Sequence, residues 1–206
     1  DLHSFPTRRS SDLAINNVEV KVTFTPRVAL DWSMFTVTPA GDPIEFTYNA
    51  QLQKPEVTSA TLVLDKDYTV ANPGVTTVAD GTKQLTLTGI GHYKGTLTRD
   101  YKIIPFSLGN GTDPVTEVTL SGIASSYQYK RAQWSPVPTV TVDMIGKLVE
   151  GTDYEVTYDE NENVATGGKV TITGKGNFKD GFVQTFAITP KSIADATVDP
   201  IADQIF

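Results

Sequence analysis

Three oxygen-bearing side chains in the second half of the sequence have the spacing of a calcium-binding loop. Asp159, Asn161 and Asn163 occupy alternate positions, as the first ligands of an EF-hand loop do. The sixth position is Val164 instead of glycine, and the twelfth is Val170 instead of glutamate. A solvated hairpin turn is the simpler interpretation, so no metal or other cofactor is assigned, and calcium binding stays an alternative.

Two tryptophans, Trp32 and Trp134, are the candidate ligand-stacking residues. An exposed Trp on a β-rich module offers a flat apolar face on which a sugar ring could stack. Trp134 lies between Gln133 and Ser135, just before Pro136. The alternative is that each Trp packs as a cover over the edge of a hydrophobic core.

No set of side chains in the sequence suits catalysis, and we expect a non-enzymatic protein. The chain has no Cys and only two His, at positions 3 and 92, so neither a thiolate site nor a His-based triad is assigned. Asp65 and Asp67 are neighbours on one expected turn, whereas glycoside hydrolysis needs two carboxylates across a cleft. His92 and the two aspartates are therefore interpreted as turn residues.

Composition favours a β-rich protein that does not bind nucleic acid. The 206 residues are 39% hydrophobic and 20% charged, with many of the β-branched and aromatic residues that are enriched in strands. The net charge is −7 and no basic stripe is present, which argues against a nucleic-acid partner. No apolar run reaches the roughly 18–20 residues of a membrane helix, so membrane insertion is not expected. An acidic surface suits an extracellular or cell-surface setting.

The elements that would position these residues are repeated in the sequence. Residues 151–190 reappear in altered form at 65–105. The matched positions lie 85 residues apart and include a Gly-x-Gly pair, large hydrophobic residues and a proline: Gly174 and Gly89, Gly176 and Gly91, Phe178 and Tyr93, Phe186 and Tyr101, Ile188 and Ile103, Pro190 and Pro105. Such shared spacing indicates an internal repeat. The glycines are interpreted as permitting a positive φ or a bulge, because no helix follows them as a phosphate loop requires.

Both copies of the repeat end in a predicted antiparallel hairpin. Residues 169–174 and 182–190 alternate in hydrophobicity, and 174–181 connect them. Residues two apart share one face of a strand, so Val170 and Ile172 should face the same core as Phe186 and Ile188. The same face in the first copy should hold Leu85, Leu87, Tyr101 and Ile103. Phe178 is expected to fold back over the open end of that core.

Short strands separated by turns every 8–12 residues or so predict an all-β fold of sandwich type. Residues 107–114, SLGNGTDP, consist mainly of turn-forming residues. They are predicted to be a linker that contributes no packing. The two copies should then unfold nearly independently.

The second copy contains a recognisable set of motifs, namely Tyr129 and Pro136, Gly151-Thr152-Asp153-Tyr154, Asn161 and Asn163, and Gly174-Lys175-Gly176-Asn177-Phe178. In these motifs it resembles the bacterial immunoglobulin-like (Ig-like) repeat of large cell-surface and secreted proteins. The resemblance covers residues 35–206, and the first copy departs from it at 71–82, where the asparagine turn is missing. It implies tandem Ig-like β-sandwich modules that serve as stalks or adhesin parts on exported proteins.

The repeat and the resemblance together predict how the chain is divided. Two Ig-like modules are expected at 31–107 and 108–191. Residues 14–30 would be the last strand of a truncated preceding module, and 192–206 the start of a truncated next one. Residues 1–13 resemble a translated sequencing adaptor and would be a scar from a shotgun or metagenomic fragment, with a basic targeting arm as the alternative.

The expected function is that of a structural or stalk repeat in a bacterial cell-surface or secreted protein such as an adhesin. The alternative is a carbohydrate- or protein-binding module attached to an extracellular enzyme. Expected partners are neighbouring modules of the same chain and, for a binding module, a host or extracellular glycan or protein. The sequence leaves open the oligomeric state and an intramolecular Lys–Asn bond.

Overall fold

The computed structural model describes residues 25–197, and the regular elements in them are almost all β-strands. Helical structure there is limited to three short 3-10 turns, η2 (Trp32–Met34), η3 (Val78–Asp80) and η4 (Ile193–Asp195). The all-β prediction is therefore confirmed for these residues. The strands are β1 (Val28–Ala29), β2 (Thr36–Thr38), β3 (Ile44–Thr47), β4 (Glu56–Thr58), β5 (Tyr68–Ala71), β6 (Lys83–Gly89), β7 (Tyr93–Lys94), β8 (Thr96–Ile104), β9 (Phe106–Ser107), β10 (Val118–Ser121), β11 (Ser126–Gln128), β12 (Thr139–Val142), β13 (Gly146–Lys147), β14 (Tyr154–Tyr158), β15 (Gly168–Gly174), β16 (Phe178–Lys179) and β17 (Gly181–Thr189).

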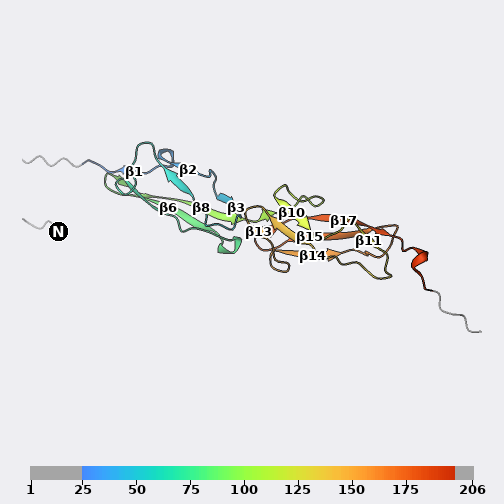
Figure 1. Cartoon of the computed structure of the whole chain (residues 1–206). Coiled ribbons are helices and arrows are strands. Elements are labelled where there is room, and N and C mark those ends of the chain that lie inside the picture. Colours follow the sequence, from blue (N-terminus) through green and yellow to red (C-terminus); the bar gives the residue numbers. More distant parts are fainter. Residues whose placement is uncertain (1–24, 198–206) are drawn as a thin grey trace, which may run out of the picture.

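Two buried hydrophobic clusters divide the strands into two halves that lie end to end (Figure 1). We call residues 27–105 the N-half and residues 106–190 the C-half. The N-half cluster contains Leu85, Leu87 and Tyr101, and the C-half cluster contains Ile172 and Phe186. Because each half buries its own apolar residues, each has a core of its own.

Each half contains a four-stranded sheet with the same strand order. The order is β3-β8-β6-β5 in the N-half and β11-β17-β15-β14 in the C-half. β3 runs parallel to the long strand β8, and β11 runs parallel to the long strand β17, while the other pairs in both sheets are antiparallel. A smaller sheet accompanies each one, β2-β4 in the N-half and β10-β12-β13 in the C-half. Val142 of β12 shares the C-half cluster with Ile172 of β15, so the smaller sheet packs on the larger one.

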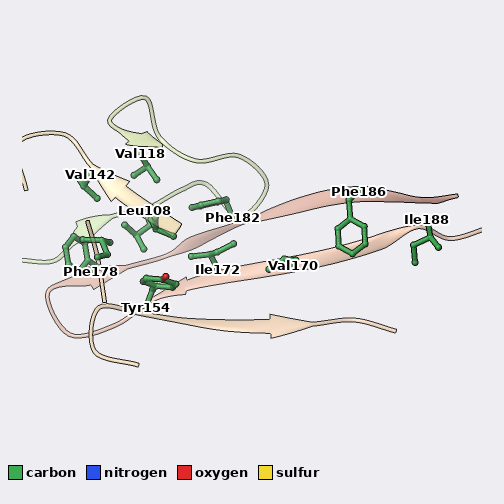
Figure 2. Packing of buried hydrophobic residues seen from close by; sticks show 12 residues of the cluster. Leu108, Val118, Val142, Tyr154, Val170, Ile172, Phe178, Phe182, Phe186 and Ile188 are labelled. Atoms are coloured by element: carbon green, nitrogen blue, oxygen red, sulfur yellow. The ribbon is translucent and has the colours of Figure 1, made fainter. Parts of the chain in front are cut away.

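The predicted closing hairpin is present in both halves. β15 and β17 pair antiparallel, with Gly168 opposite Phe186 and Ile172 opposite Phe182. The side chains predicted to share a core are all buried, and Figure 2 shows them in one row: Val170, Ile172, Phe186 and Ile188. Their N-half counterparts are buried in the same way, namely Leu85, Leu87, Tyr101 and Ile103. Phe182, which the repeat did not highlight, is buried as well.

The repeated glycines lie where the backbone needs them. Gly91 and Gly176 have φ values of 60° and 64°, the left-handed region that glycine adopts at little cost. Gly89 and Gly174 leave room for a close backbone approach instead. A Cβ on Gly174 would come within 2.6 Å of the Lys179 nitrogen.

Residues 107–114 pack closely against the C-half, so the prediction of a linker without packing is wrong. Leu108 is fully buried in the C-half cluster. The Gly111 N–H donates to the Gly181 carbonyl at 2.8 Å, and the Val183 N–H donates to the Thr112 carbonyl at 3.1 Å. The turn-forming residues bend the chain along β17, where its backbone groups find partners far away in sequence.

The first strand of each half pairs with the tip of the closing hairpin of the same half. β1 runs parallel to β7, and β9 runs parallel to β16. Leu30 is buried in the N-half cluster, so residues 28–30 belong to the N-half and not to a preceding unit. The remaining predictions for 1–13, for the strand at 14–24 and for 198–206 lie outside the described residues.

Candidate functional site

Trp134 lies between β11 and β12 and covers one edge of the C-half core. It is half-buried and packs against the C-half cluster. The Tyr127 ring lies 4.6 Å away between centroids, and the Lys130 Nζ lies 3.8 Å from the Trp134 centroid. The indole N–H donates to the Gln128 carbonyl at 3.0 Å. These contacts support the interpretation of Trp134 as a cover, because a stacking sugar would have to displace Lys130.

An open hollow of about 990 Å³ adjoins Trp134 at the end of the C-half. Tyr129, Val164, Pro190 and Ile193 contribute to its lining. Val164 is 40% exposed and Ile193 is 91% exposed, so its wall presents apolar surface to solvent. The hollow is the place beside a candidate tryptophan where a ligand or partner would fit.

Trp32 occupies a separate place in the N-half. It begins η2, is half-buried and packs against the N-half cluster. The Arg99 guanidinium lies 4.3 Å from its ring centroid, and Phe35 meets it edge-on at 6.5 Å. The two tryptophans pack on different cores, so they do not form a common binding face.

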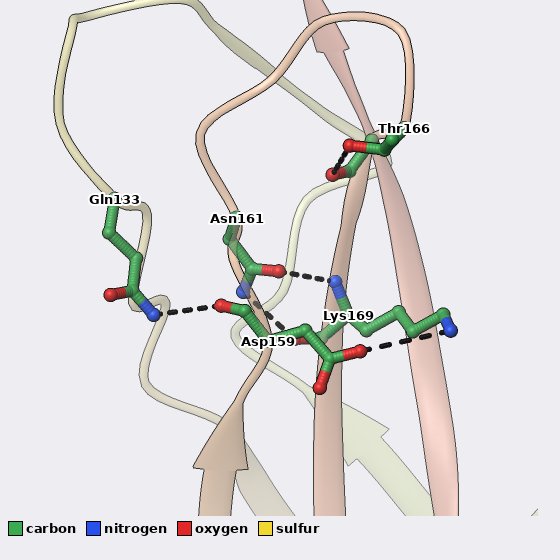
Figure 3. A network of polar contacts seen from close by, with 6 residues as sticks. Gln133, Asp159, Asn161, Thr166 and Lys169 are labelled. Atoms are coloured by element: carbon green, nitrogen blue, oxygen red, sulfur yellow. Dashed lines mark hydrogen bonds and ion pairs between the residues drawn. The ribbon is translucent and has the colours of Figure 1, made fainter.

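The residues with calcium-loop spacing do not converge on an ion site. Asn161 is fully buried, and its amide is used by the protein (Figure 3). Its Nδ2 donates to the carbonyls of Trp134 at 3.2 Å and Lys169 at 2.8 Å, and its Oδ1 accepts the Lys169 N–H at 2.6 Å. Among residues 25–197 no three acidic or His side chains are grouped to hold a metal. The expectation of a solvated turn is wrong for Asn161 and holds for the exposed Asn163.

The Asn161 side chain continues the sheet where the backbone leaves it. The last β14–β15 pair is Tyr158 with Val170, so the next pair in register would be Asp159 with Lys169. The Asn161 amide takes that place, since one amide offers both a donor and an acceptor to Lys169. The repeat contained a signal for this burial, because the 86-residue offset between Asp67 and Asp153 also pairs Asn161 with the apolar Val75.

The surroundings of Asn161 combine one exposed ion pair with the half-buried phenol of Tyr158. Lys169 Nζ lies 3.7 Å from the Asp159 carboxylate, and both side chains are more than half exposed. The ammonium group therefore lies against Asp159 and not against the Asn161 amide (Figure 3), which is not the arrangement that a Lys–Asn bond needs. The Tyr158 hydroxyl donates to the Pro136 carbonyl at 3.0 Å. Burial, with Glu150 as a smaller cause, raises the pKa of Tyr158.

The other titratable candidates occupy turns, as predicted. His92 is exposed in the turn before β7. The Asp67 carboxylate accepts the Val63 N–H at 2.9 Å, and its counterpart Asp153 accepts the Val149 N–H at 2.8 Å. Asp65 lies in the same turn as Asp67, so these two carboxylates do not lie on opposite sides of a cleft.

A packed joint between the halves is the feature that sequence analysis missed. The Val78 N–H of the N-half donates to the Asn177 Oδ1 of the C-half at 2.9 Å. The Phe178 ring lies edge-on to Tyr48 and Phe106, with centroids 5.4 Å and 6.3 Å away. The repeat predicted that Phe178 would fold back over its own core, and this buried ring also meets the other half.

No family model, curated protein or solved structure matches the chain. Among the helices of the described residues, none combines the length and the hydrophobicity required to cross a membrane.

Proposed function

We propose that this chain is a non-enzymatic structural repeat of a bacterial cell-surface or secreted protein such as an adhesin. Its two halves would be tandem Ig-like β-sandwich modules that act as a stalk. The observation that carries the proposal is the packed joint between Asn177–Phe178 and the N-half. A stalk needs neighbouring units held in a fixed relation, and this joint provides such contacts.

Two kinds of contact and a short connection favour a stiff joint. Aromatic rings of both halves meet edge-on at Phe178, an arrangement that contributes beyond the buried area alone. The Asn177 amide accepts a backbone N–H from the other half. The connection itself is short, because β8 ends at Ile104 and β9 begins at Phe106. With β1 near one end of the molecule and η4 near the other (Figure 1), the halves add their lengths.

Nuclear magnetic relaxation of backbone amides tests the stalk proposal. The two halves of the full chain should tumble as one elongated body with a common diffusion tensor. Replacing Asn177 and Tyr48 by Ala removes joint contacts without removing a fully buried core residue, and should let the halves tumble separately. His92→Ala, at the corresponding turn of the N-half, is the matched control and should change nothing. Independent tumbling of folded halves in the unaltered chain would contradict the proposal.

The hollow beside Trp134 favours one second candidate, a module that binds an extracellular glycan or protein. Its apolar wall at Val164 and Ile193 lies close to an aromatic residue. Glycan-array binding that is lost in Trp134→Ala and kept in Trp32→Phe would support this candidate. Absence of binding to any glycan would leave the stalk role as the better account.

A further inference from the structure

The N-half has a defined surface that receives the hairpin tip of the C-half. The tip residues are Asn177 and Phe178. They contact Tyr48 through its ring and Val78 through its backbone N–H. The first strand of the C-half, β9, follows Pro105 and lies beside this surface, since the Phe106 N–H donates to the Asn177 carbonyl at 3.0 Å.

The C-half carries a counterpart for each element of this surface. Tyr48 corresponds to Tyr129, because both follow the first strand of their sheet and donate their N–H to the last strand, at Ile104 and Thr189. Val78 corresponds to Val164 by the offset that relates Asp67 to Asp153. The segment after Pro105 corresponds to the segment after Pro190, with Leu108 matched to Ile193. Tyr129, Val164, Lys191 and Ile193 all line the hollow beside Trp134.

The counterparts differ in whether they are covered. Leu108 is fully buried, whereas Ile193 is 91% exposed. Val78 is half-buried, whereas Val164 is exposed. Exposed apolar side chains at positions that are covered in a working interface indicate a surface without its partner.

We propose that this hollow is an acceptor for the closing-hairpin tip of another unit of the same fold. The tip would carry Asn or His followed by an aromatic residue and Lys, as in Asn177-Phe178-Lys179 and His92-Tyr93-Lys94. The proposal deepens the stalk function by naming the partner and the residues that hold it. The aromatic residue would lie against Tyr129, and the Val164 N–H would donate to the Asn or His side chain.

One rearrangement accompanies docking. Residues 193–195 form the 3-10 turn η4, which is capped by the Ser192 hydroxyl at 3.2 Å from the Ala194 nitrogen. The two residues before the turn, Lys191 and Ser192, are the counterparts of Phe106 and Ser107, which pair with β16 as strand β9. Ile193 is the counterpart of Leu108, whose N–H donates to the Lys179 carbonyl at 3.0 Å. Docking would therefore let Lys191–Ile193 pair with the incoming tip and unwind the turn that begins at Ile193. A one-turn helix is marginal in isolation, so the incoming backbone bonds can replace it.

An extended chain tests the acceptor directly. Residues 109–190 are placed immediately after Ile193, the counterpart of Leu108, so that a further unit follows both existing halves in register. Amide exchange at Val164 should slow by about tenfold or more relative to the unextended chain, which reports a closed interface. Ile193→Asp and Tyr129→Ala should abolish this slowing. Met144→Asp is the control, because Met144 is 99% exposed and does not line the hollow.

A second chain controls for the possibility that the junction at Ile193 prevents the added unit from folding. In it, residues 106–190 follow Pro190, so that the native β9 sequence opens the added unit. If the added unit folds in either chain, as judged by slow exchange in its own hairpin, while Val164 exchanges as before, the proposal is wrong. An added unit that stays unfolded in both chains also counts against it, because the hollow then fails to support a neighbour. The tumbling of the unextended chain tests the stalk role separately, so the two proposals can fail independently.

Discussion

Val75 and Asn161 occupy the same place in the two halves and close the edge of the sheet in different ways. In the N-half, Val75 and Gln53 exchange two backbone hydrogen bonds of 2.8 and 2.9 Å, and the Val75 side chain enters the core. In the C-half, the Trp134 N–H donates to the Asn161 carbonyl at 2.9 Å, but the Trp134 carbonyl accepts from the Asn161 side chain. Both residues are fully buried.

The difference shows that one buried side-chain amide can replace part of a backbone ladder. A buried polar group is tolerated only when its donors and acceptors are satisfied. Asn161 meets this condition because Trp134 and Lys169 use both ends of its amide. The N-half needs no such side chain, because at Val75 the backbone itself makes the bridge.

The largest effect is expected from Phe186→Ala, which would break the C-half core and spare the N-half. Phe186 is 5% exposed and lies over Gly168 on the facing strand. Removing a buried Phe typically costs about 3–5 kcal/mol of unfolding free energy. Urea unfolding monitored by Trp134 fluorescence in a Trp32→Phe background would measure it. Gln184→Ala, on the same strand face but partly exposed, should cost little.

An intermediate effect is expected from Asn161→Val, which gives the C-half the residue of the N-half. The N–H and carbonyl of Lys169 and the carbonyl of Trp134 would lose their partners. Each buried group left unsatisfied costs about 1–3 kcal/mol, and partial access of water limits the total to about 2–4 kcal/mol. Urea unfolding of the C-half and amide exchange at Lys169 are the measurements.

The exposed Asn163 provides the control for this substitution. Asn163→Ala changes an asparagine of the same loop whose side chain is solvated, so the unfolding free energy should stay the same. If Asn163→Ala destabilised the C-half as much as Asn161→Val, the loop sequence and not the buried amide would be responsible.

The smallest effect is a pH dependence of the unfolding free energy that we expect from the loop of Asp80 and not from the corresponding loop of the C-half. In the N-half, hydrogen bonds from the N–H groups of Thr76 and Thr77 hold the pKa of Asp80 below its ordinary value. The C-half has the uncharged Thr166 at the matching position. Because its pKa is lowered in the folded state, the ionised Asp80 contributes to the free energy of unfolding. This contribution is complete above the pKa of an unfolded Asp, about 3.9, and is lost as the pH falls through the pKa of the folded state.

Asp80→Asn should therefore destabilise the N-half near neutral pH and lose most of that effect in strong acid. Urea unfolding followed by Trp32 fluorescence, in a Trp134→Phe background, would measure the difference at both pH values. Thr166→Ala should show no such pH dependence. An Asp80→Asn effect that is equal at neutral and acid pH would show that the charge of Asp80 does not stabilise the loop.

The features that depend on the alternation of apolar and polar residues along one segment could be predicted from the sequence. The hairpin, its shared face and the glycine turn at Gly176 follow from residue spacing along one segment. The linker prediction for residues 107–114 is wrong because turn-forming residues do not reveal that the Gly111 N–H bonds to the Gly181 carbonyl, far along the chain. The prediction of a solvated turn is wrong for Asn161 because this residue lies among charged neighbours, and only comparison with Val75 indicates its burial. The joint at Phe178 depends on tertiary contacts that no local pattern encodes.

The parallel pairing of β11 with β17 determines how the C-half would respond to mechanical tension. The chain enters this half at β9, near Phe178, and leaves it beyond Ile188, and Figure 2 shows these two side chains at opposite ends of the core. A pull on the two ends would act along β17, which lies between β11 and β15. Its hydrogen bonds run across the direction of pull. The pull would load these hydrogen bonds together in shear, and would not break them one after another. The C-half should therefore unfold only at high force.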